Sequence, residues 1–264
     1  MTVQSVVDAD ALRAALTGPG RLFAEVSWVP STGSTNADLA AAAQAGAPSG
    51  TVLVAGHQSA GRGRFARRWE APPGTSVAIS VLLRPDVEVA HWSWLPLVTG
   101  VAVAEGLAEA AGVRAEVKWP NDVLIGGRKV CGILSERVAG AAVIGMGINT
   151  TLDADRLPVP TATSLALAGS TAPVTDVVIG VLAAIEGAYL RWASGSDLRR
   201  WYGQRCATVG ADVRVLESAT SSVEGRATGV DASGRLLVET PVGVRAFAAG
   251  DVLHLRRSEE VAAR

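Results

Sequence analysis

The sequence predicts an α+β protein with a large N-terminal part and a small C-terminal part made only of strands. Up to about residue 206, short apolar runs that suit buried strands alternate with longer helical patterns. From Asp212 onward only short strands separated by glycine turns remain. Even spacing of this kind indicates a small β-barrel of about fifty residues. We place the boundary near residue 208, which gives predicted domains at 1–208 and 209–264.

The first predicted helix begins in the sequence Ser-Thr-Asn-Ala-Asp-Leu. Segment 34–46 runs through alanines to Gly46, and glycine commonly ends a helix. Thr35, with Asp38 three residues later, has the spacing of a helix-capping pair. We therefore expect Thr35 to cap this helix.

The remaining elements follow from hydrophobic periodicity and glycine punctuation. Gly126 and Gly127 suit the two-residue turn of a β-hairpin. A turn is also expected at 231–234, and a frayed tail at 256–264. In chain order, the N-terminal part should contain a strand at 51–55, a glycine-rich loop at 56–74, a strand at 76–83, a helix at 92–111, a hairpin over 117–136, a strand at 142–148, a proline-interrupted segment at 158–173 and helical structure over 175–206.

Composition limits the class of function. The chain has 264 residues, 48% of them hydrophobic, and a formal net charge of -1, which is too little positive charge for bulk capture of nucleic acid. Cys131 and Cys206 lack the spacing of a disulfide framework or a zinc motif. The N-terminus has no basic leader, and no apolar run approaches the length of a membrane span. We expect a cytoplasmic protein that binds neither DNA nor membrane.

The only two lysines, Lys118 and Lys129, lie in one stretch, KWPNDVLIGGRK, whereas the chain has 22 arginines. A compact ammonium on a flexible stem can follow a moving phosphate oxygen better than a planar guanidinium can. Pro120 places Asn121 and Asp122 at a turn, and an antiparallel return can bring both lysines to one side of a sheet. These features favour an anion site over the alternative, a coding bias that spared two lysines by chance.

The loop GRGRFARRW carries four arginines among glycines, at positions 62, 64, 67 and 68. Glycine lets a backbone approach an anion, and guanidinium groups bind phosphate oxygens in pairs. The loop therefore suits a nucleotide or an acyl phosphate, and its closure over a charged intermediate would exclude water. The alternatives are a solvated basic loop and an RNA-binding arginine patch.

Other motifs are less specific. GMGIN at 145–149 suits close approach of a flat ring or a phosphate, and it suits tight packing equally well. His57, His91 and His254 show no partner pattern, so we expect structural roles for them. The sequence has no P-loop, no GxSxG motif and no HExxH motif, which removes the reactions that depend on them.

Together these motifs resemble those of biotin protein ligases. The resemblance rests on Ser-Thr-Asn at 34–36, Gln58 with the arginine loop, KWPNDVLIGGRKVCGIL at 118–134 and GMGIN, and it extends to GVDASGRLLVE and GDV near the C-terminus. It implies a mixed β-sheet flanked by helices, related to class II aminoacyl-tRNA synthetases, and an SH3-like C-terminal barrel. It also implies two half-reactions. Biotin and MgATP, as substrates, would give biotinyl-5'-AMP, and the biotinyl group would then pass to a lysine of a biotin carboxyl carrier domain. No permanently bound cofactor is expected.

The resemblance also implies roles for individual residues. By that resemblance Lys129 would bind the carboxylate and the α-phosphate, and Lys118, Asn121, Asp122 and Asn149 would face the nucleotide. Independently of the resemblance, the need to deprotonate an acceptor lysine makes Asp122 our candidate for the base. The expected catalytic residues are Lys129, Arg64, Lys118 and Asp122. The expected biotin-binding residues are Ser34, Thr35, Asn36, Gln58, Arg62, Gly63, Arg64, Trp69, Lys129 and Gly132. The expected ATP-binding residues are Arg62, Arg64, Arg67, Trp69, Lys118, Asn121, Lys129 and Asn149. Magnesium would be held by the ATP phosphates with help from Asn121 or Asp122.

Two features depart from the family pattern. Ala66 stands where the family loop usually has glycine, and residues 150–165 offer no adenine-stacking aromatic. Only about thirty residues precede Ser34, too few for a DNA-binding helix-turn-helix domain, so no repressor role is expected. The oligomeric state stays open between monomer and homodimer. Alternative functions are lipoate ligation on the same scaffold, a nucleic-acid-binding module and an inactive biotin-binding scaffold.

Overall fold

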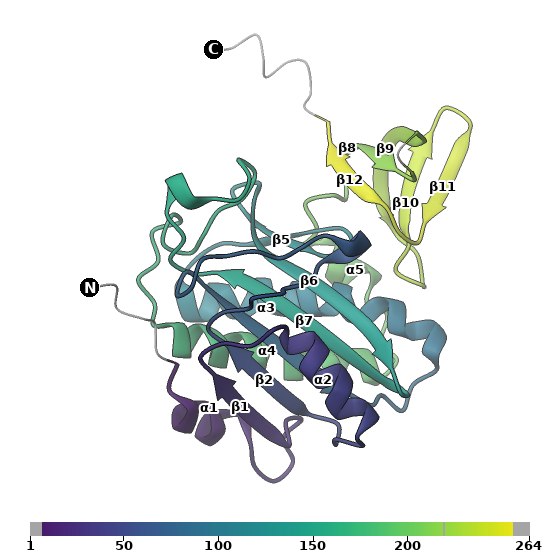
Figure 1. The fold of residues 1–264 in the computed structure, drawn as a ribbon. Helices are drawn as coiled ribbons and strands as arrows, with labels where there is room; N and C mark the ends of the chain where they lie inside the picture. Colours follow the sequence, from purple (N-terminus) through teal and green to yellow (C-terminus); the bar gives the residue numbers. More distant parts are fainter. Residues whose placement is uncertain (1–6, 219, 256–264) are drawn as a thin grey trace.

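The computed structural model describes residues 7–218 and 220–255. Two β-sheets organise the fold (Figure 1). The larger sheet has the strand order β1-β2-β3-β7-β6-β5-β4. Its strands are β1 (Glu25–Val29), β2 (Thr51–Ala55), β3 (Ser76–Leu83), β4 (Glu116–Lys118), β5 (Asp122–Ile125), β6 (Arg128–Val138) and β7 (Ala141–Asn149). The β1–β2 pair is parallel and the other pairs are antiparallel, so the expected mixed sheet is confirmed.

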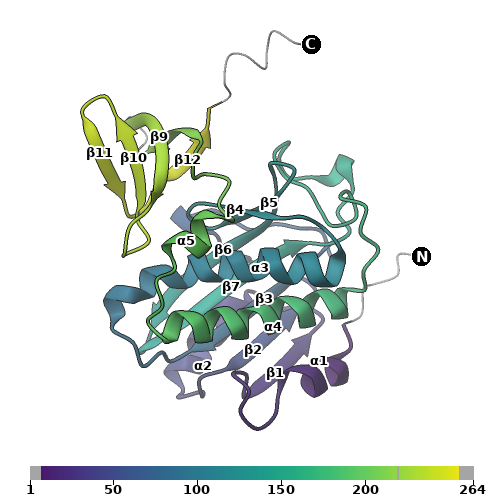
Figure 2. The ribbon, with the colours of Figure 1, turned by 180° about the vertical axis from the view of Figure 1, so that it is seen from behind.

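Helices cover both faces of this sheet. α3 and α4 lie side by side over one face (Figure 2), and α2 crosses the other (Figure 1). The α-helices are α1 (Ala9–Leu16), α2 (Thr35–Gln44), α3 (Leu95–Ala111), α4 (Val174–Ala193) and α5 (Arg199–Gly203), and the 3-10 helices are η1 (Arg64–Ala66), η2 (Val89–Trp94) and η3 (Ala154–Arg156).

The C-terminal sheet is antiparallel, with the strand order β11-β10-β9-β8-β12. Its two edge strands, β11 and β12, do not pair in the described part of the chain, so these strands form an open sheet and not a closed barrel. The strands are β8 (Asp212–Leu216), β9 (Ser222–Val230), β10 (Leu236–Thr240), β11 (Gly243–Phe247) and β12 (Asp251–His254). The predicted domain boundary near residue 208 stays a prediction, and the predicted tail at 256–264 lies outside the described residues.

Several predicted elements differ in detail. The cap of α2 is Ser34, whose Oγ accepts a hydrogen bond from the Ala37 amide, and not Thr35. The helix predicted over 92–111 begins instead as η2 and becomes α3 at Leu95, with a proline in its first turn. The helical segment predicted over 175–206 divides into α4 and α5, because Gly195 adopts a positive φ of 73° between them. The predicted hairpin is present, and Gly126 and Gly127 both have positive φ at its turn.

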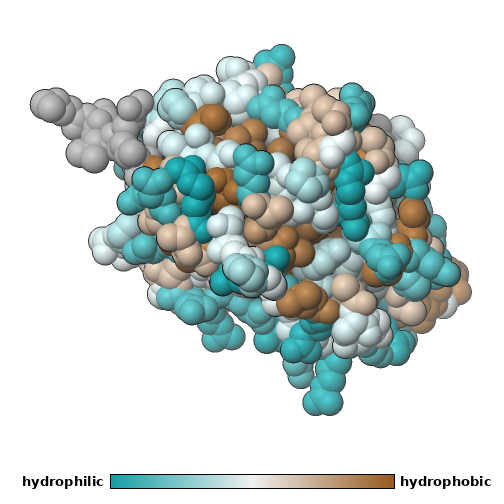
Figure 3. Space-filling model, turned by 90° about the horizontal axis from the view of Figure 1, so that it is seen from below, coloured by the Kyte–Doolittle hydropathy of each residue, from teal (hydrophilic) through white to brown (hydrophobic). Residues whose placement is uncertain are grey.

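The stretch Val89–Ala111 is long and apolar enough to cross a membrane, so the statement that no apolar run approaches that length is wrong. Within this stretch, 67% of the most apolar 18-residue window is buried inside the protein, where α3 packs on α4 and on the sheet. We therefore interpret it as a core helix. On the face seen in Figure 3, hydrophobic residues are scattered among hydrophilic ones, as on many globular proteins.

The contact between α3 and α4 depends on two glycines. A Cβ added at Gly106 would lie 2.6 Å from Val181 Cα and 2.7 Å from the Gly180 carbonyl oxygen. A Cβ at Gly180 would lie 2.8 Å from Ala110 Cβ. The absence of side chains lets the two helix backbones approach and cover the sheet together.

Replacement of Gly106 by alanine should push these helices apart and lower the free energy of unfolding by about 1–3 kcal/mol. The matched control is Gly187→Ala on the exposed side of α4, where an added Cβ meets no atom within 4 Å. That change should raise the free energy of unfolding by about 0.5–1 kcal/mol, because alanine favours helix over glycine. Urea denaturation measures both, and a stabilising Gly106→Ala would contradict the packing argument.

Candidate functional site

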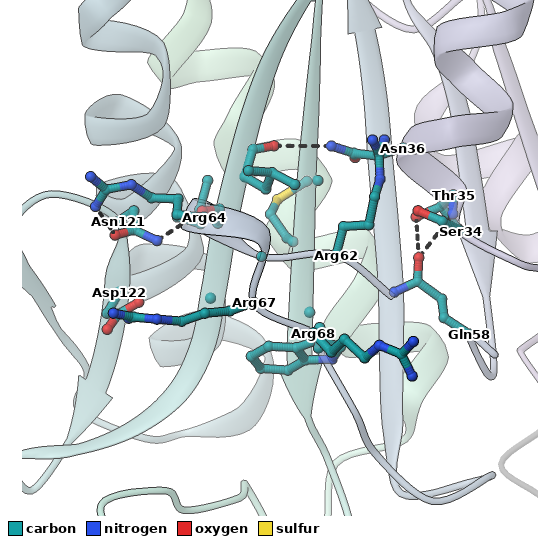
Figure 4. Close-up of a pocket in the computed structure, with 18 of the residues that line it drawn as sticks. Ser34, Thr35, Asn36, Gln58, Arg62, Arg64, Arg67, Arg68, Asn121 and Asp122 are labelled. Atoms are coloured by element: carbon teal, nitrogen blue, oxygen red, sulfur yellow. Dashed lines mark hydrogen bonds between the residues drawn. The ribbon is translucent and has the colours of Figure 1, made fainter. Parts of the chain in front are cut away.

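A cavity of about 150 Å³ opens between the N-terminus of α2, the arginine loop and strands β5 to β7 (Figure 4). It brings together most of the residues that the sequence singled out. The predicted site residues that line it are Ser34, Thr35, Asn36, Gln58, Arg62, Gly63, Arg64, Arg67, Trp69, Asn121, Asp122, Lys129 and Gly132. Two predicted residues, Lys118 and Asn149, do not line it.

Two glycines on neighbouring strands make room for the Trp69 ring. Gly132 of β6 and Gly147 of β7 are register partners. A Cβ at Gly147 would lie 2.4 Å from Trp69 Cε2, and a Cβ at Gly132 would lie 2.9 Å from Trp69 Cζ3. Lys129 Nζ lies 5.7 Å from the centre of the same ring. Any side chain at these glycines would displace an aromatic surface that lines the cavity.

One end of the cavity is neutral and polar. Gln58 Oε1 accepts hydrogen bonds from the Thr35 amide at 2.8 Å and from Thr35 Oγ1 at 3.1 Å. Ser80, fully buried in β3, has its Oγ 2.7 Å from both Thr35 Oγ1 and Asn36 Oδ1. Since the buried groups bond one another, the amides and hydroxyls at this end are held in fixed orientations.

Glu136 joins this end of the cavity to the arginine loop. Its Oε2 accepts from Asn36 Nδ2 and from Arg62 Nη2, each at 2.8 Å. Asn36 can lie there only because residue 145 is glycine, since a Cβ at Gly145 would lie 2.1 Å from Asn36 Oδ1. Figure 4 shows Arg62 extending from the loop toward Asn36.

The arginine loop forms a tight hairpin over the cavity. The Gly63 amide donates to the Arg67 carbonyl at 2.7 Å, and the Trp69 amide donates to the Gly61 carbonyl at 3.0 Å. At its tip Phe65 and Ala66 have positive φ values of 55° and 58°. Two consecutive non-glycine residues in the left-handed region cost conformational energy. The alanine found at the usual glycine position therefore keeps a backbone conformation that glycine would adopt without cost.

Three cations around the cavity each contact an acceptor of their own. Arg64 Nη1 donates to Asn121 Oδ1 at 2.8 Å, and Asn121 Nδ2 donates to the Ile133 carbonyl. Lys129 Nζ lies 2.6 Å from Asp122 Oδ1, an oxygen with no other hydrogen-bond partner in the described chain. Arg67 pairs with Asp251 of β12. Burial lowers the pKa of Arg64, whereas the hydrogen bond to Asp251 raises the pKa of Arg67.

Lys118 and Asn149 do not line the cavity, although Lys118 is on β4 beside β5 and Asn149 ends β7. Lys118 is the register partner of Asp122, and burial lowers its pKa while Asp122 raises it to a lesser extent. Asn149 is buried, and its Nδ2 donates to the Thr163 carbonyl at 2.9 Å. The Lys129 amide donates to the Thr161 carbonyl at 2.7 Å. Residues 161–163 thus hold the backbone of Lys129 and the side chain of Asn149 in place.

Sequence reasoning assigned no site role to Ser80, Glu136 or Asp251. A serine within the apolar run SVAISVLL was a usable signal for Ser80. Glu136 and Asp251 gave no local signal of a site role, because their roles depend on partners far away in the chain. For Gly145, within the GMGIN motif, the structure shows close packing against Asn36. His254 also has a partner, with its Nε2 3.0 Å from Thr208 Oγ1. Among the described residues, no group of three His, Cys, Asp or Glu side chains is placed to hold a metal ion.

Comparisons with known proteins point in one direction. Residues 28–153 match the model of the Biotin/lipoate A/B protein ligase family, and residues 208–255 match the Biotin protein ligase C terminal domain. A biotin--[acetyl-CoA-carboxylase] ligase of Mycobacterium tuberculosis is 38% identical over 257 residues, which cover 95% of this chain and 96% of that protein. A protein of the same name from Paracoccus denitrificans is 33% identical, over 84% of this chain and 97% of its own. The structure of the Aquifex aeolicus biotin protein ligase in complex with biotin and ATP superposes with a TM-score of 0.77 at 27% identity, over 89% of this chain and 100% of that one.

Substitution of Ala66 by glycine should stabilise the protein by about 1 kcal/mol, because glycine adopts positive φ without steric cost. Ala60, which is exposed in the same loop and has no positive φ, is the control. Ala60→Gly should lower the free energy of unfolding, since glycine adds freedom to the unfolded chain. If urea denaturation showed that Ala66→Gly and Ala60→Gly lower the free energy of unfolding equally, the tip of the loop would not be strained.

Proposed function

We infer the chemistry of this cavity from the premise that the chain belongs to the biotin protein ligase family. It is an ATP-dependent ligase that forms biotinyl-5'-AMP from biotin and ATP and transfers biotin to a lysine of a biotin carboxyl carrier domain. The observation that carries this reading is a neutral polar end at Thr35 and Gln58 that adjoins a cationic end at Arg62, Arg64 and Lys129. Such a cavity suits a ligand with a polar uncharged ring at one end and an acid group at the other.

The difficulty in the first half-reaction is charge. Biotin's carboxylate is ionised at neutral pH, so the reaction needs no general base, but two anions must meet in line. We propose that Lys129 leaves Asp122 to bridge the carboxylate and the α-phosphate, and that Arg62 and Arg64 take the charge that develops. The carboxylate oxygen then bonds to the α-phosphorus as the bond to the leaving pyrophosphate breaks.

The ATP end of the site is a further proposal. Lys118, Asn121 and Asn149 would face the nucleotide, Lys118 by its charge from the neighbouring strand β4 and Asn149 by holding the segment around Thr163. We propose that magnesium enters as MgATP, bound by phosphate oxygens, which suit this hard cation. Asn121 already has hydrogen bonds to Arg64 and Ile133. Of the two residues expected to help bind magnesium, Asp122 is therefore the one whose oxygens become available once Lys129 has moved.

The second half-reaction has the opposite need. An acceptor lysine must lose a proton, at a cost of about 4–5 kcal/mol at pH 7, before its nitrogen attacks the acyl carbonyl and AMP leaves. Asp122 Oδ1 is the proposed base, because Lys129 is its one close polar partner in the described chain and the first step draws that lysine away. We place the reaction in the cytoplasm and leave the choice between monomer and homodimer open.

The direct test of this function is transfer to an acceptor. The purified chain should biotinylate a carrier domain with ATP and biotin, and it should transfer lipoate at least about 100-fold more slowly, because lipoate lacks the groups that Thr35 and Gln58 would bond. Mass spectrometry of the acceptor measures both products. Faster transfer of lipoate would move the chain to the other branch of the family.

Replacement of Lys129 by alanine should lower the rate of biotin-dependent pyrophosphate exchange by about 10²–10³-fold, the scale of removing one electrostatic donor. Lys129→Arg keeps the positive charge but not the compact ammonium. Its exchange rate should therefore fall between those of the wild type and the alanine variant. An exchange rate near that of the wild type in the alanine variant would remove this lysine from the mechanism.

Replacement of Arg64 by alanine should release biotinyl-5'-AMP, because the loop would lose its hydrogen bond to Asn121 and its contact with the phosphate. Escaped adenylate reacts with surface lysines of a bystander protein such as serum albumin, and a biotin-specific blot measures this labelling. Arg13→Ala is the control, since that side chain is on α1, does not line the cavity and is 53% exposed. Retention of the intermediate by the Arg64 variant would refute the role of this residue.

A further inference from the structure

The C-terminal sheet contributes one residue to the cavity. Among the described lining residues, Asp251 is the one that comes from strands β8 to β12. Both of its carboxylate oxygens accept from the guanidinium of Arg67, which lies on the arginine loop 184 residues earlier in the chain. The bond therefore joins the arginine loop to the C-terminal sheet at the edge of the cavity.

The arginine loop depends on few outside contacts. In the described chain, the backbone hydrogen bonds of residues 62–68 stay within the loop. Three side chains link the loop to the rest of the protein by hydrogen bonds: Arg62 to Glu136, Arg64 to Asn121 and Arg67 to Asp251. Because the loop is a hairpin closed by its own hydrogen bonds, a bond that fixes one of its arginines to the rest of the protein restrains the whole loop.

These three links have different fates in the proposed reaction. Arg62 and Arg64 turn toward the phosphate, so their bonds to Glu136 and Asn121 weaken when the adenylate forms. The pair between Arg67 and Asp251 is then the link that remains between loop and protein. This step rests on the proposed function, and it assigns Arg67 to a bond with protein and not to the direct ATP contact expected from the sequence.

Asp251 is itself held in place from two sides. Gly250 before it has a φ of 149°, and an added Cβ there would lie 3.0 Å from Val215 Cγ1. At the other end of β12, His254 Nε2 lies 3.0 Å from Thr208 Oγ1, which accepts from the Trp119 amide at 3.1 Å. This strand is thus linked through Thr208 to Trp119, the residue after β4, at the end opposite Asp251.

A second contact fixes the C-terminal sheet on the larger part. Trp94 Nε1 donates to the Ala232 carbonyl at 2.8 Å, and Trp119 Nε1 donates to the Gly234 carbonyl at 3.1 Å. Both acceptors lie in the turn that the sequence predicted at 231–234. The sheet is therefore a fixed support from which Asp251 can restrain a loop.

We propose that Asp251 is a positioning residue that holds Arg67, and with it the arginine loop, over the cavity, so that the C-terminal sheet retains the acyl-adenylate between the two half-reactions. It acts through Arg67 and touches no reacting atom. Its loss should speed the escape of the intermediate and leave the formation of the intermediate nearly unchanged.

The test is a double-mutant cycle on the full chain with Asp251→Asn, Arg67→Gln and both changes together. Each single variant should release biotinyl-5'-AMP about five- to tenfold faster than the wild type, the scale of a lost bidentate pair. The double variant should be no more than about twofold faster than the faster single variant, because both changes remove one interaction. Pyrophosphate exchange by Asp251→Asn should stay within about threefold of the wild-type rate.

The control is Glu224→Gln, which removes the ion pair with Arg214 on the same sheet away from the cavity and should leave release unchanged. Two results would overturn the proposed role of the Arg67–Asp251 pair. One is a release rate within about twofold of the wild type in Asp251→Asn, and the other is a double variant in which the two single effects multiply. If Asp251 only stabilised the fold, Asp251→Asn would lower the pyrophosphate-exchange rate and the melting temperature as well as the retention of biotinyl-5'-AMP.

A second readout needs no catalysis. Phe65 at the tip of the loop is 61% exposed, whereas Phe23 and Phe247 are buried, so chymotrypsin cleavage after Phe65 reports opening of the loop. Without substrates, Asp251→Asn and Arg67→Gln should yield the 1–65 fragment several-fold faster than the wild type and the Glu224 control. If the wild type formed no adenylate, the proposed function would fail. Equal cleavage rates in the wild type and the two variants would separately refute the role of the Arg67–Asp251 pair in holding the loop.

Discussion

The site depends on how several positive charges share one small cavity. Arg62, Arg64, Arg67 and Lys129 all line it, and each contacts its own acceptor on a strand or, for Arg64, in the turn before β5. These acceptors offset the repulsion among the cations and set the direction from which each one reaches the cavity. The account of function is that substrate oxygens replace some of these acceptors, so two acid groups that repel each other can meet and react.

The fold supplies the acceptors from separate elements. Glu136 and Asp122 come from neighbouring parts of the β5–β6 hairpin, whereas Asp251 comes from the C-terminal sheet. Glycines at 132, 145 and 147 leave room above the central strands for Trp69 and Asn36. The apolar helices behind the sheet keep those strands in place, so the polar side chains can lie on a rigid surface.

The sequence predicted the class of fold, most strand positions and most lining residues, because these follow from local periodicity and from compact motifs. It could not place Ser34 as the cap of α2, since Ser34 and Thr35 are both good capping residues and the choice depends on Gln58 binding Thr35. Nor could it find Glu136 or Asp251, whose roles arise only when β6 and β12 meet the arginine loop. Short range reasoning also missed α1 and the open form of the C-terminal sheet.

The central claim is that Lys129 exchanges Asp122 for the anions of the substrates. A crystal structure with biotin and a non-hydrolysable ATP analogue tests this most directly. The account predicts ligand density between Gln58 and Lys129, with Lys129 Nζ within hydrogen-bond distance of both the carboxylate and the α-phosphate and displaced from Asp122. Density elsewhere, or a Lys129 that still pairs with Asp122 while both ligands are bound, would contradict it.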